Sequence, residues 1–240
     1  MSEKIDKGYL LSIHEYQDND HVINLIFSDG NIVRALSKGS RKILSKNGRH
    51  LLMGSFLEVE YFQSRTIGKL SLIKKIKSIN SISLAESSNF TIIFLNNYLT
   101  KNKINKFNFE FYQEIIKAAL NYDLMSSIII CLKIIIDDQG LQLILDKCLL
   151  CKRKEVYSLS FKLSGFICNN CYNSNQDLKT TKDFNKALYY TNEKYFNVLE
   201  HINFDIKFKI AKFYANYLYE NNGTYCDLDY FKSLKVADLK

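Results

Sequence analysis

The chain has 240 residues, a net charge of +8, and 47% hydrophobic and 13% aromatic residues. This composition supports a folded protein of one large domain or two smaller ones, and it excludes an intrinsically disordered chain. The N-terminus, MSEKIDKGYL, lacks an apolar signal core, and the most apolar run, residues 128–136, is too short to cross a bilayer. We therefore expect a soluble, cytoplasmic protein.

The positive charge is concentrated between residues 30 and 85. This segment holds eleven lysine and arginine residues and two glutamates, so its net charge is +9 and that of the remaining chain is −1. A field of one sign over one region favours a polyanionic partner. The alternative, a solvated surface of a lysine-rich protein, predicts scattered charge instead.

Five short strands are predicted in the first 80 residues, at 8–15, 21–28, 31–37, 56–62 and 69–79. In the fourth of these, Leu57, Val59 and Tyr61 alternate with more polar neighbours. Asp29-Gly30 predicts a two-residue type I′ hairpin turn between the second and third strands. Five strands in so short a segment predict a small barrel, most commonly an OB-fold, over residues 1–80.

The connection between the third and fourth strands, LSKGSRKILSKNGRH at residues 36–50, is basic and contains no carboxylate. A flexible basic loop on a small barrel is typical of proteins that bind a nucleic-acid backbone. The candidate DNA-binding residues are Arg34, Lys38, Arg41, Lys42, Lys46 and Arg49.

Residues 81–240 are predicted to form an all-α domain. Apolar residues at helical spacing predict helices at 87–100, 108–121, 183–201 and 205–221. A further helix, capped by Ser126 or Ser127, runs through residues 128–136 and ends at Gly140. This helix is apolar on nearly all sides, so it should be the centre of a bundle. Residues 173–181 are read as a polar linker.

Four of the six cysteines follow the pattern C-x2-C-x16-C-x2-C: Cys148, Cys151, Cys168 and Cys171. Each pair can supply two thiolates from one tight turn, so the pattern predicts one structural zinc ion, Zn²⁺, in a module at about 146–173. Four accidentally spaced cysteines are the alternative. A catalytic zinc is disfavoured because four thiolates leave no position for water. Cys131 and Cys226 are assigned to core packing.

The sequence contains no recognisable constellation of catalytic residues. It has no phosphate-binding glycine loop, no G-x-S-x-G and no H-E-x-x-H, and its four histidines are scattered. We therefore expect a protein that is not an enzyme.

Three stretches together resemble one family. KGYLLSIHEYQDND at 7–20 is similar to a family-specific opening strand, and ALSKGSRKILSK at 35–46 is similar to the family's basic loop, with Lys38, Gly39, Arg41 and Ser45 at matching positions. At 140–171, G-L-Q after a helix leads directly into the cysteine pairs. In this order the three stretches resemble the RecO family of bacterial recombination mediators. The last 65 or so residues resemble the family only in being helical.

The resemblance implies an N-terminal OB-fold, a helical domain with an inserted zinc module, and a non-catalytic role in DNA repair. Family members bind single- and double-stranded DNA, anneal complementary strands and engage the acidic C-terminal tail of the single-strand binding protein SSB. With RecR they help load RecA onto SSB-coated gaps, which implies a location at the nucleoid. Two alternatives remain open: an RNA-binding module acting in translation or tRNA handling, and a metalloenzyme with an open zinc position.

Overall fold

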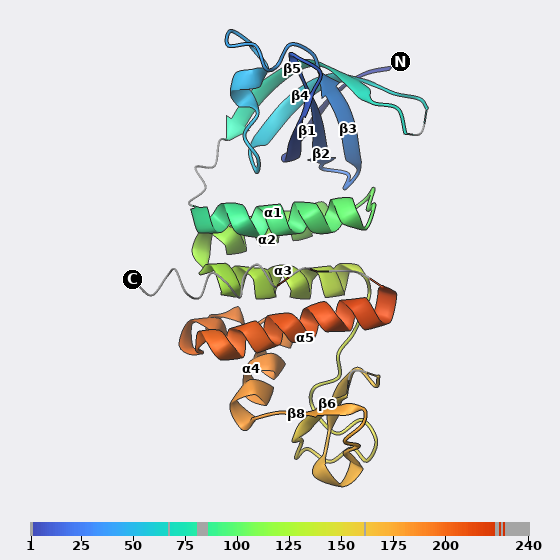
Figure 1. Cartoon of the computed structure of the whole chain (residues 1–240), viewed down its shortest axis with the longest axis vertical. Helices are drawn as coiled ribbons and strands as arrows, with labels where there is room; N and C mark the ends of the chain where they lie inside the picture. The colour runs from blue at the N-terminus through green and yellow to red at the C-terminus, as the bar shows by residue number, and fades with distance from the viewer. Residues whose placement is uncertain are drawn as a thin grey trace. The chain divides into compact units, whose positions relative to one another are not determined.

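The computed structural model describes residues 2–66, 68–80, 86–160 and 162–223, together with Cys226 and Leu228; for residues 86–89 it describes the backbone only. Contacts divide the chain into two compact units, Met1–Leu120 and Asn121–Lys240. Figure 1 shows the elements of both units, with the first in blue to green.

The first unit begins with five strands: β1 (Ser2–Tyr16), β2 (Asp20–Phe27), β3 (Ile32–Ser37), β4 (Phe56–Gln63) and β5 (Ser71–Asn80). They pair in the order β1-β2-β3-β5-β4, and β4 pairs back onto β1, so the sheet closes on itself (Figure 1). All neighbours are antiparallel except β3 and β5. The five strands confirm the sequence prediction, and the arrangement is consistent with an OB-fold.

Strand β1 is longer than predicted because it pairs with two partners in succession. Residues Ser2–Tyr9 pair with β4, and the part from Gly8 onward pairs with β2. A Cβ atom at Gly8 would lie 2.2 Å from the Ile26 carbonyl oxygen, so glycine permits the close approach where β1 passes from one partner to the other. The hydroxyl of Tyr61 on β4 donates to Asp6 on β1 at 2.8 Å.

The interior of the sheet is filled by alternate residues of all five strands, as the periodicity of residues 56–62 predicted. The buried set consists of Leu10, Ile23, Leu25, Phe27, Ala35, Leu57, Val59, Tyr61, Ile73 and Ile76. The residues between Leu57, Val59 and Tyr61 are only partly buried.

The hairpin between β2 and β3 is present, but the predicted turn type is wrong. The Gly30 N–H donates to the Phe27 carbonyl at 2.8 Å, and Phe27 N–H donates to the Asn31 carbonyl at 3.1 Å, which leaves a three-residue loop. Only Gly30, with φ of 79°, has a positive φ in this loop. A type I′ turn needs two such residues, whereas a type I turn followed by a left-handed glycine needs one.

Two helices, α1 (Glu86–Lys101) and α2 (Phe109–Asn121), belong to the first unit. The Asn96 amide of α1 donates to the carbonyl of Leu11, where the pairing of β1 with β2 is interrupted. In the connection between the helices, the Asn105 carbonyl accepts from the Ile32 N–H at 2.9 Å. The Phe107 N–H donates to the Gly30 carbonyl at 2.9 Å. The predicted domain boundary at residue 80 coincides with the end of β5, yet these helices pack on the strands.

The second unit is built around α3 (Leu124–Asp138), which packs against α5 (Phe204–Asn222). Every residue of α3 from Met125 to Ile136 is buried, which confirms the central helix. Its cap is Asp123, whose carboxylate accepts from the Ser126 N–H at 3.1 Å, so the prediction of a serine cap is wrong. The N–H and the hydroxyl of Ser126 instead donate to the Asp123 carboxylate.

The helix predicted at 183–201 is interrupted. It consists of α4 (Lys182–Asn192) and a 3-10 helix, η3 (Phe196–His201). Lys194, between them, has φ of 64°, a left-handed conformation that ends an α-helix. Neither glycine nor proline marks the break in the sequence.

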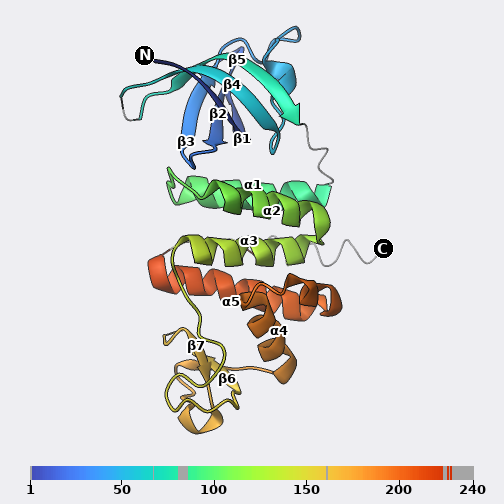
Figure 2. The ribbon, with the colours of Figure 1, turned by 180° about the vertical axis from the view of Figure 1, so that it is seen from behind.

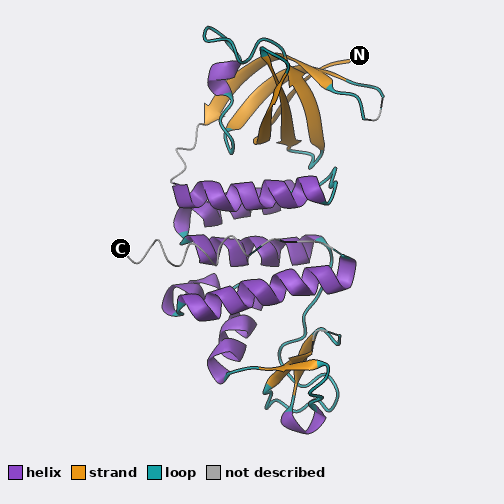
Figure 3. Cartoon of the chain, in the orientation of Figure 1, coloured by secondary structure: helices purple, strands orange, loops and turns teal. Residues whose placement is uncertain are grey.

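No helix in the described part of the chain has both the length and the apolar character needed to cross a membrane. Figure 3 shows that short strands, in orange, also occur in the cysteine-containing part of the second unit.

Candidate functional site

The four cysteines lie in a small module with its own three-stranded sheet. Its strands are β6 (Ser158–Ser160), β7 (Gly165–Ile167) and β8 (Asp177–Lys179), and they pair antiparallel in the order β7-β6-β8. Figure 2 labels β6 and β7, and Figure 1 labels β8. The β6–β7 hairpin folds the insert back, so the second cysteine pair meets the first. The segment predicted as a polar linker, 173–181, contains β8, so that prediction is wrong over these residues.

The sulfur atoms of Cys148, Cys151, Cys168 and Cys171 all lie within 4.8 Å of one another. With a Zn–S distance of about 2.3 Å, tetrahedral coordination requires sulfur atoms roughly 3.8 Å apart. The Cys151 and Cys168 sulfurs are 3.4 Å apart, far beyond a disulfide bond of about 2.05 Å, and all six cysteines are free thiols. The geometry and the donor set therefore fit a zinc ion.

Although burial opposes ionisation, hydrogen bonds of the two turns lower the pKa of both Cys148 and Cys168 and so favour ionised sulfur at these two positions. Burial opposes ionisation of Cys148, but backbone hydrogen bonds from Cys151, Cys168 and Leu150 lower the pKa of Cys148 to about 6. The hydrogen bond with Cys168, together with burial, raises the pKa of Cys171 to about 12. Four thiolates at this spacing repel one another, so a dication is what allows all four to ionise together.

The cysteines are held on one side by an apolar cluster. Cys148 and Cys168 are buried with Ile167, and Leu149 and Val156 pack against them. Cys151 is exposed and Cys171 is half-buried. Within the described residues this metal-competent group contains cysteine alone, so it offers the four-thiolate environment of a structural site.

The basic connection between β3 and β4 is anchored at its first arm, contrary to the expectation of a flexible loop. The Gly39 N–H donates to the Asp20 carboxylate at 2.7 Å, and the Arg41 N–H donates to the Asn19 carbonyl at 2.9 Å. Ser40 is buried and lies 2.9 Å from the His21 ring nitrogen Nδ1. The turn between β1 and β2 thus fixes the start of the connection.

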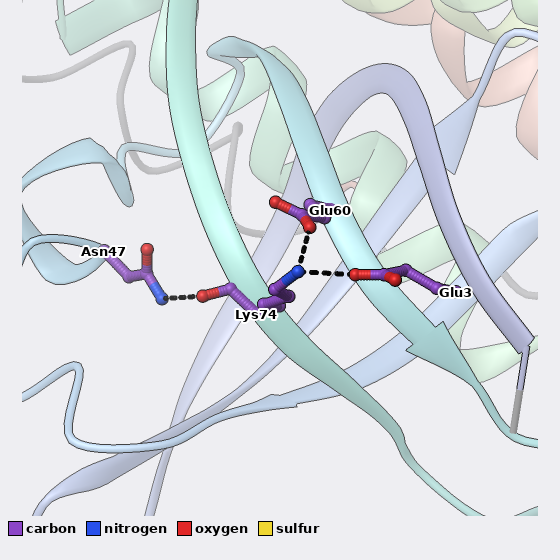
Figure 4. A network of polar contacts seen from close by, with 4 residues as sticks. All are labelled: Glu3, Asn47, Glu60 and Lys74. Atoms are coloured by element: carbon purple, nitrogen blue, oxygen red, sulfur yellow. Dashed lines mark hydrogen bonds and ion pairs between the residues drawn. The ribbon is translucent and has the colours of Figure 1, made fainter.

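The second arm is anchored on β5 by Asn47. Its side chain donates to the Lys74 carbonyl at 3.4 Å, as Figure 4 shows. The same side chain accepts from the Ile76 N–H at 3.0 Å. The two arms also touch, because a Cβ atom at Gly48 would lie 2.1 Å from the Ser40 carbonyl oxygen. The basic side chains are therefore presented on a defined backbone.

Most of the predicted DNA-binding cations form no ion pair with a carboxylate of the described residues. Lys38, Lys42, Lys46 and Arg49 are exposed and form no ion pair with any residue that the structure describes. Arg41 contacts Glu15 at 2.9 Å. Elsewhere on the barrel, carboxylates neutralise two lysines of β5. Glu3 and Glu60 contact Lys74, as Figure 4 shows. Glu58 contacts Lys77.

Arg34 lies apart from the other five candidates. It projects from the outer face of β3 into a cavity of about 340 Å³ that is also lined by His14, Asn24 and residues of α1. Sequence proximity placed Arg34 with the loop, but alternation along β3 places it beside the helix.

The second unit contains a groove that the sequence did not reveal. It has a volume of about 420 Å³ and lies among β8, α4 and α5. Its apolar lining comes from Leu178, Phe184 and Phe213, and its cations are Lys179, Lys209 and Lys212. The spacing of Lys209 and Lys212 on one face of α5 is the signal that could have indicated it.

Comparisons with known proteins relate this chain to a family of DNA repair proteins. The family model described as "Recombination protein O N terminal" matches residues 1–82. A DNA repair protein RecO from Mesoplasma florum is 24% identical over 237 residues, which cover 94% of this chain and 88% of the relative. The RecO protein of Mycoplasma mycoides subsp. mycoides is 25% identical, with 98% of each chain covered.

Among solved structures, an asparaginyl-tRNA synthetase from Entamoeba histolytica aligns with 79% of this chain and 42% of its own length, at 11% identity and a TM-score of 0.30. That score is too low to indicate a shared fold. The matched N-terminal domain and the similarity of the two relatives over nearly the whole chain support the assignment of this chain to the RecO family.

Proposed function

We propose that this chain is a DNA repair and recombination mediator that binds and anneals single-stranded DNA through its N-terminal barrel. The observation that carries the proposal is the anchored basic connection within a domain matched by the RecO N-terminal family. Phosphate contacts from lysine and arginine carry no sequence information, which suits a protein that must act at any gap.

The DNA-binding set of the loop consists of Lys38, Arg41, Lys42, Lys46 and Arg49, and Arg34 contributes from a separate position. If the five loop cations each neutralise one phosphate of single-stranded DNA, log K should fall with log salt at a slope of about −3.5. Neutralising the phosphates also lowers the repulsion between two strands. Lower repulsion is what annealing of complementary strands requires.

One structural zinc ion belongs to the proposal. Cys148, Cys151, Cys168 and Cys171 would hold it as thiolates, and the ion would supply cross-linking and no reaction chemistry. Three strands of three residues each are too short to persist alone. Binding to a structural zinc site contributes on the order of 10–16 kcal/mol in small peptides, which is ample to hold this module.

The groove among β8, α4 and α5 is the surface we assign to the C-terminal tail of SSB. An acidic segment with an apolar end fits lysines that flank an apolar floor. The same role as a mediator implies action with RecR to help RecA replace SSB, at the nucleoid in the cytoplasm. The role is non-catalytic.

A triple variant tests the DNA-binding role. Lys38→Ala, Lys42→Ala and Lys46→Ala together should weaken binding of single-stranded DNA and reduce the salt slope by about 2. The matched control replaces three exposed helical lysines, Lys117, Lys182 and Lys186, by alanine and should leave the slope unchanged. Equal slopes for both triple variants would contradict the assignment, and preferential competition by tRNA would favour an RNA-binding module instead.

A further inference from the structure

Two apolar side chains stand fully in solvent within the basic connection. Ile43 is 101% and Leu44 is 94% exposed, whereas the next most exposed large hydrophobic side chain among the described residues, Ile5, is 65% exposed. Full exposure of two adjacent aliphatic side chains is unfavourable in water. Burial of these side chains against a partner would be favourable.

The backbone displays this pair at the tip of a turn. The Ser45 N–H donates to the Lys42 carbonyl at 2.9 Å, so Ile43 and Leu44 are the two central residues of a β-turn. The hydroxyl of Ser45 then accepts from the Gly48 N–H at 3.0 Å. Because the arms on both sides are anchored, the side chains are held outward before any partner arrives.

The surroundings of the pair select the partner. Lys42 and Lys46 lie one and two residues away and carry no ion pair within the described residues, and no carboxylate occurs between residues 30 and 57. An apolar tip flanked by free cations matches a chain whose backbone is anionic and whose bases are apolar on their faces.

The face of the barrel that OB-folds use for oligonucleotides is covered. On β2, Val22 and Ile26 point away from the barrel interior and are nevertheless buried. The carbonyl of Leu11 on the same side is bonded to Asn96 of α1, and the connection after α1 bonds to Ile32 and Gly30. A nucleic acid must therefore be held chiefly at another surface of this barrel, and the exposed turn is such a surface.

We propose that Ile43 and Leu44 form a wedge that enters between adjacent bases of single-stranded DNA, while Lys42 and Lys46 neutralise the phosphates on either side. The inference rests on the proposed DNA-binding function and adds a contact to the bases. Aliphatic wedges of this kind separate stacked bases in other nucleic-acid complexes. A strand with separated bases is exposed for pairing with its complement.

The test compares the wild type with the double variant Ile43→Ser, Leu44→Ser. The probe is a single-stranded oligonucleotide with 2-aminopurine among adenines, whose fluorescence rises when the base is unstacked. Saturating wild-type protein should raise the fluorescence, and the double variant should not. The variant should bind roughly fivefold to tenfold more weakly at an unchanged salt slope, since its cations remain. The swap Ile43→Leu, Leu44→Ile should restore the signal.

The outcomes separate the wedge from the binding function on which it rests. If the wild type does not bind the oligonucleotide, the proposed function itself fails. If the wild type binds and the double variant matches it in affinity and fluorescence, the wedge is overturned and the charge-based interface stands. A loss of binding to phosphatidylglycerol vesicles by the variant, with DNA binding and fluorescence intact, would overturn the wedge in favour of a membrane surface.

Discussion

The side-chain amide of Asn47 lies beside Lys74 and takes the place of a neighbouring strand. It donates to the Lys74 carbonyl (Figure 4) and accepts from the Ile76 N–H. These are the two groups that a paired strand would satisfy. Strand β3 pairs with β5 only at Ala35–Ser71 and Leu36–Leu72, so this edge of β5 would otherwise face solvent. Asn47 thus joins the second arm of the basic connection to the barrel.

Asn47→Ala should therefore destabilise the barrel and loosen the basic connection. Loss of two hydrogen bonds is expected to lower the free energy of unfolding by about 1–2 kcal/mol. Hydrogen exchange at the Ile76 amide should become faster, and chemical denaturation should show the stability loss. Asn80→Ala, at an exposed position of the same strand, is the control and should leave both measurements unchanged. Equal protection of Ile76 in the wild type and Asn47→Ala would contradict the anchoring role.

The cysteine module should contain one zinc ion per chain. Elemental analysis of Cys148→Ser should find no zinc, because a three-thiolate site with a hydroxyl binds the ion much more weakly. Cys226→Ser, outside the cluster, should retain it. Cobalt substitution should give the spectrum of four-thiolate coordination. A wild-type protein purified without metal, with an ordered module, would refute the assignment.

Removal of the zinc by a chelator should have a local effect. The three short strands and the two cysteine turns share the metal-binding cluster, whereas the barrel has its own core. We expect faster hydrogen exchange over residues 146–179 and unchanged exchange in β1–β5. General loss of protection throughout the barrel would be inconsistent with a local structural role.

The groove of the second unit should bind an acidic peptide. Lys209→Glu with Lys212→Glu reverses two charges that flank the apolar floor, so affinity for a labelled SSB tail peptide should fall at least about tenfold, a difference of about 1.4 kcal/mol. Fluorescence anisotropy measures this change. Lys117→Glu with Lys186→Glu, which reverses two charges at exposed helical positions, serves as the control for net charge. Retained tail binding by the double variant would exclude this groove.

The second unit should lose stability in acid through Asp123. Burial opposes ionisation of this carboxyl, but hydrogen bonds from Lys207, at 2.7 Å, and from the hydroxyl and N–H of Ser126 outweigh it and lower the pKa of Asp123. Its stabilising contribution is therefore complete above the ordinary value of 3.8 and disappears as the pH falls through the lowered folded-state pKa.

Denaturation of the wild type and Asp123→Asn at several pH values measures this contribution. The variant should be less stable at neutral pH, because the nearly buried Lys207 ammonium loses its anionic partner. The difference between the two proteins should shrink below pH 3.8. A constant difference across this range would show that the ion pair contributes nothing.

Strand positions and the cysteine cluster were readable from the sequence because both depend on local spacing. Alternation along residues 56–62 and the x2 spacing of the cysteine pairs act over a few residues. The break at Lys194 was not readable, since a lysine in the left-handed conformation is maintained by packing and leaves no glycine as a marker. Likewise, β8 lies in a polar stretch and forms only because β6 supplies a partner edge.

The candidate DNA-binding residues show a second limit of sequence reasoning. Charge counting identified the basic segment, but it could not separate Arg34, on the helix-covered face of β3, from the lysines of the turn. Nor could it show that Lys74 and Lys77 are engaged by glutamates of neighbouring strands. Both facts depend on strand pairing between residues distant in the chain, which local patterns do not specify.

The double pairing of β1 also sets the order in which the barrel can be completed during synthesis. The first strand meets β2 soon after both leave the ribosome, but its N-terminal half waits for β4, as the 55-residue separation of Asp6 and Tyr61 illustrates. Until then one edge of a nascent hairpin stays open to other chains. A fragment that ends before residue 56 would therefore be prone to aggregate, whereas a fragment that contains residues 1–80 has all the strands needed to close the sheet.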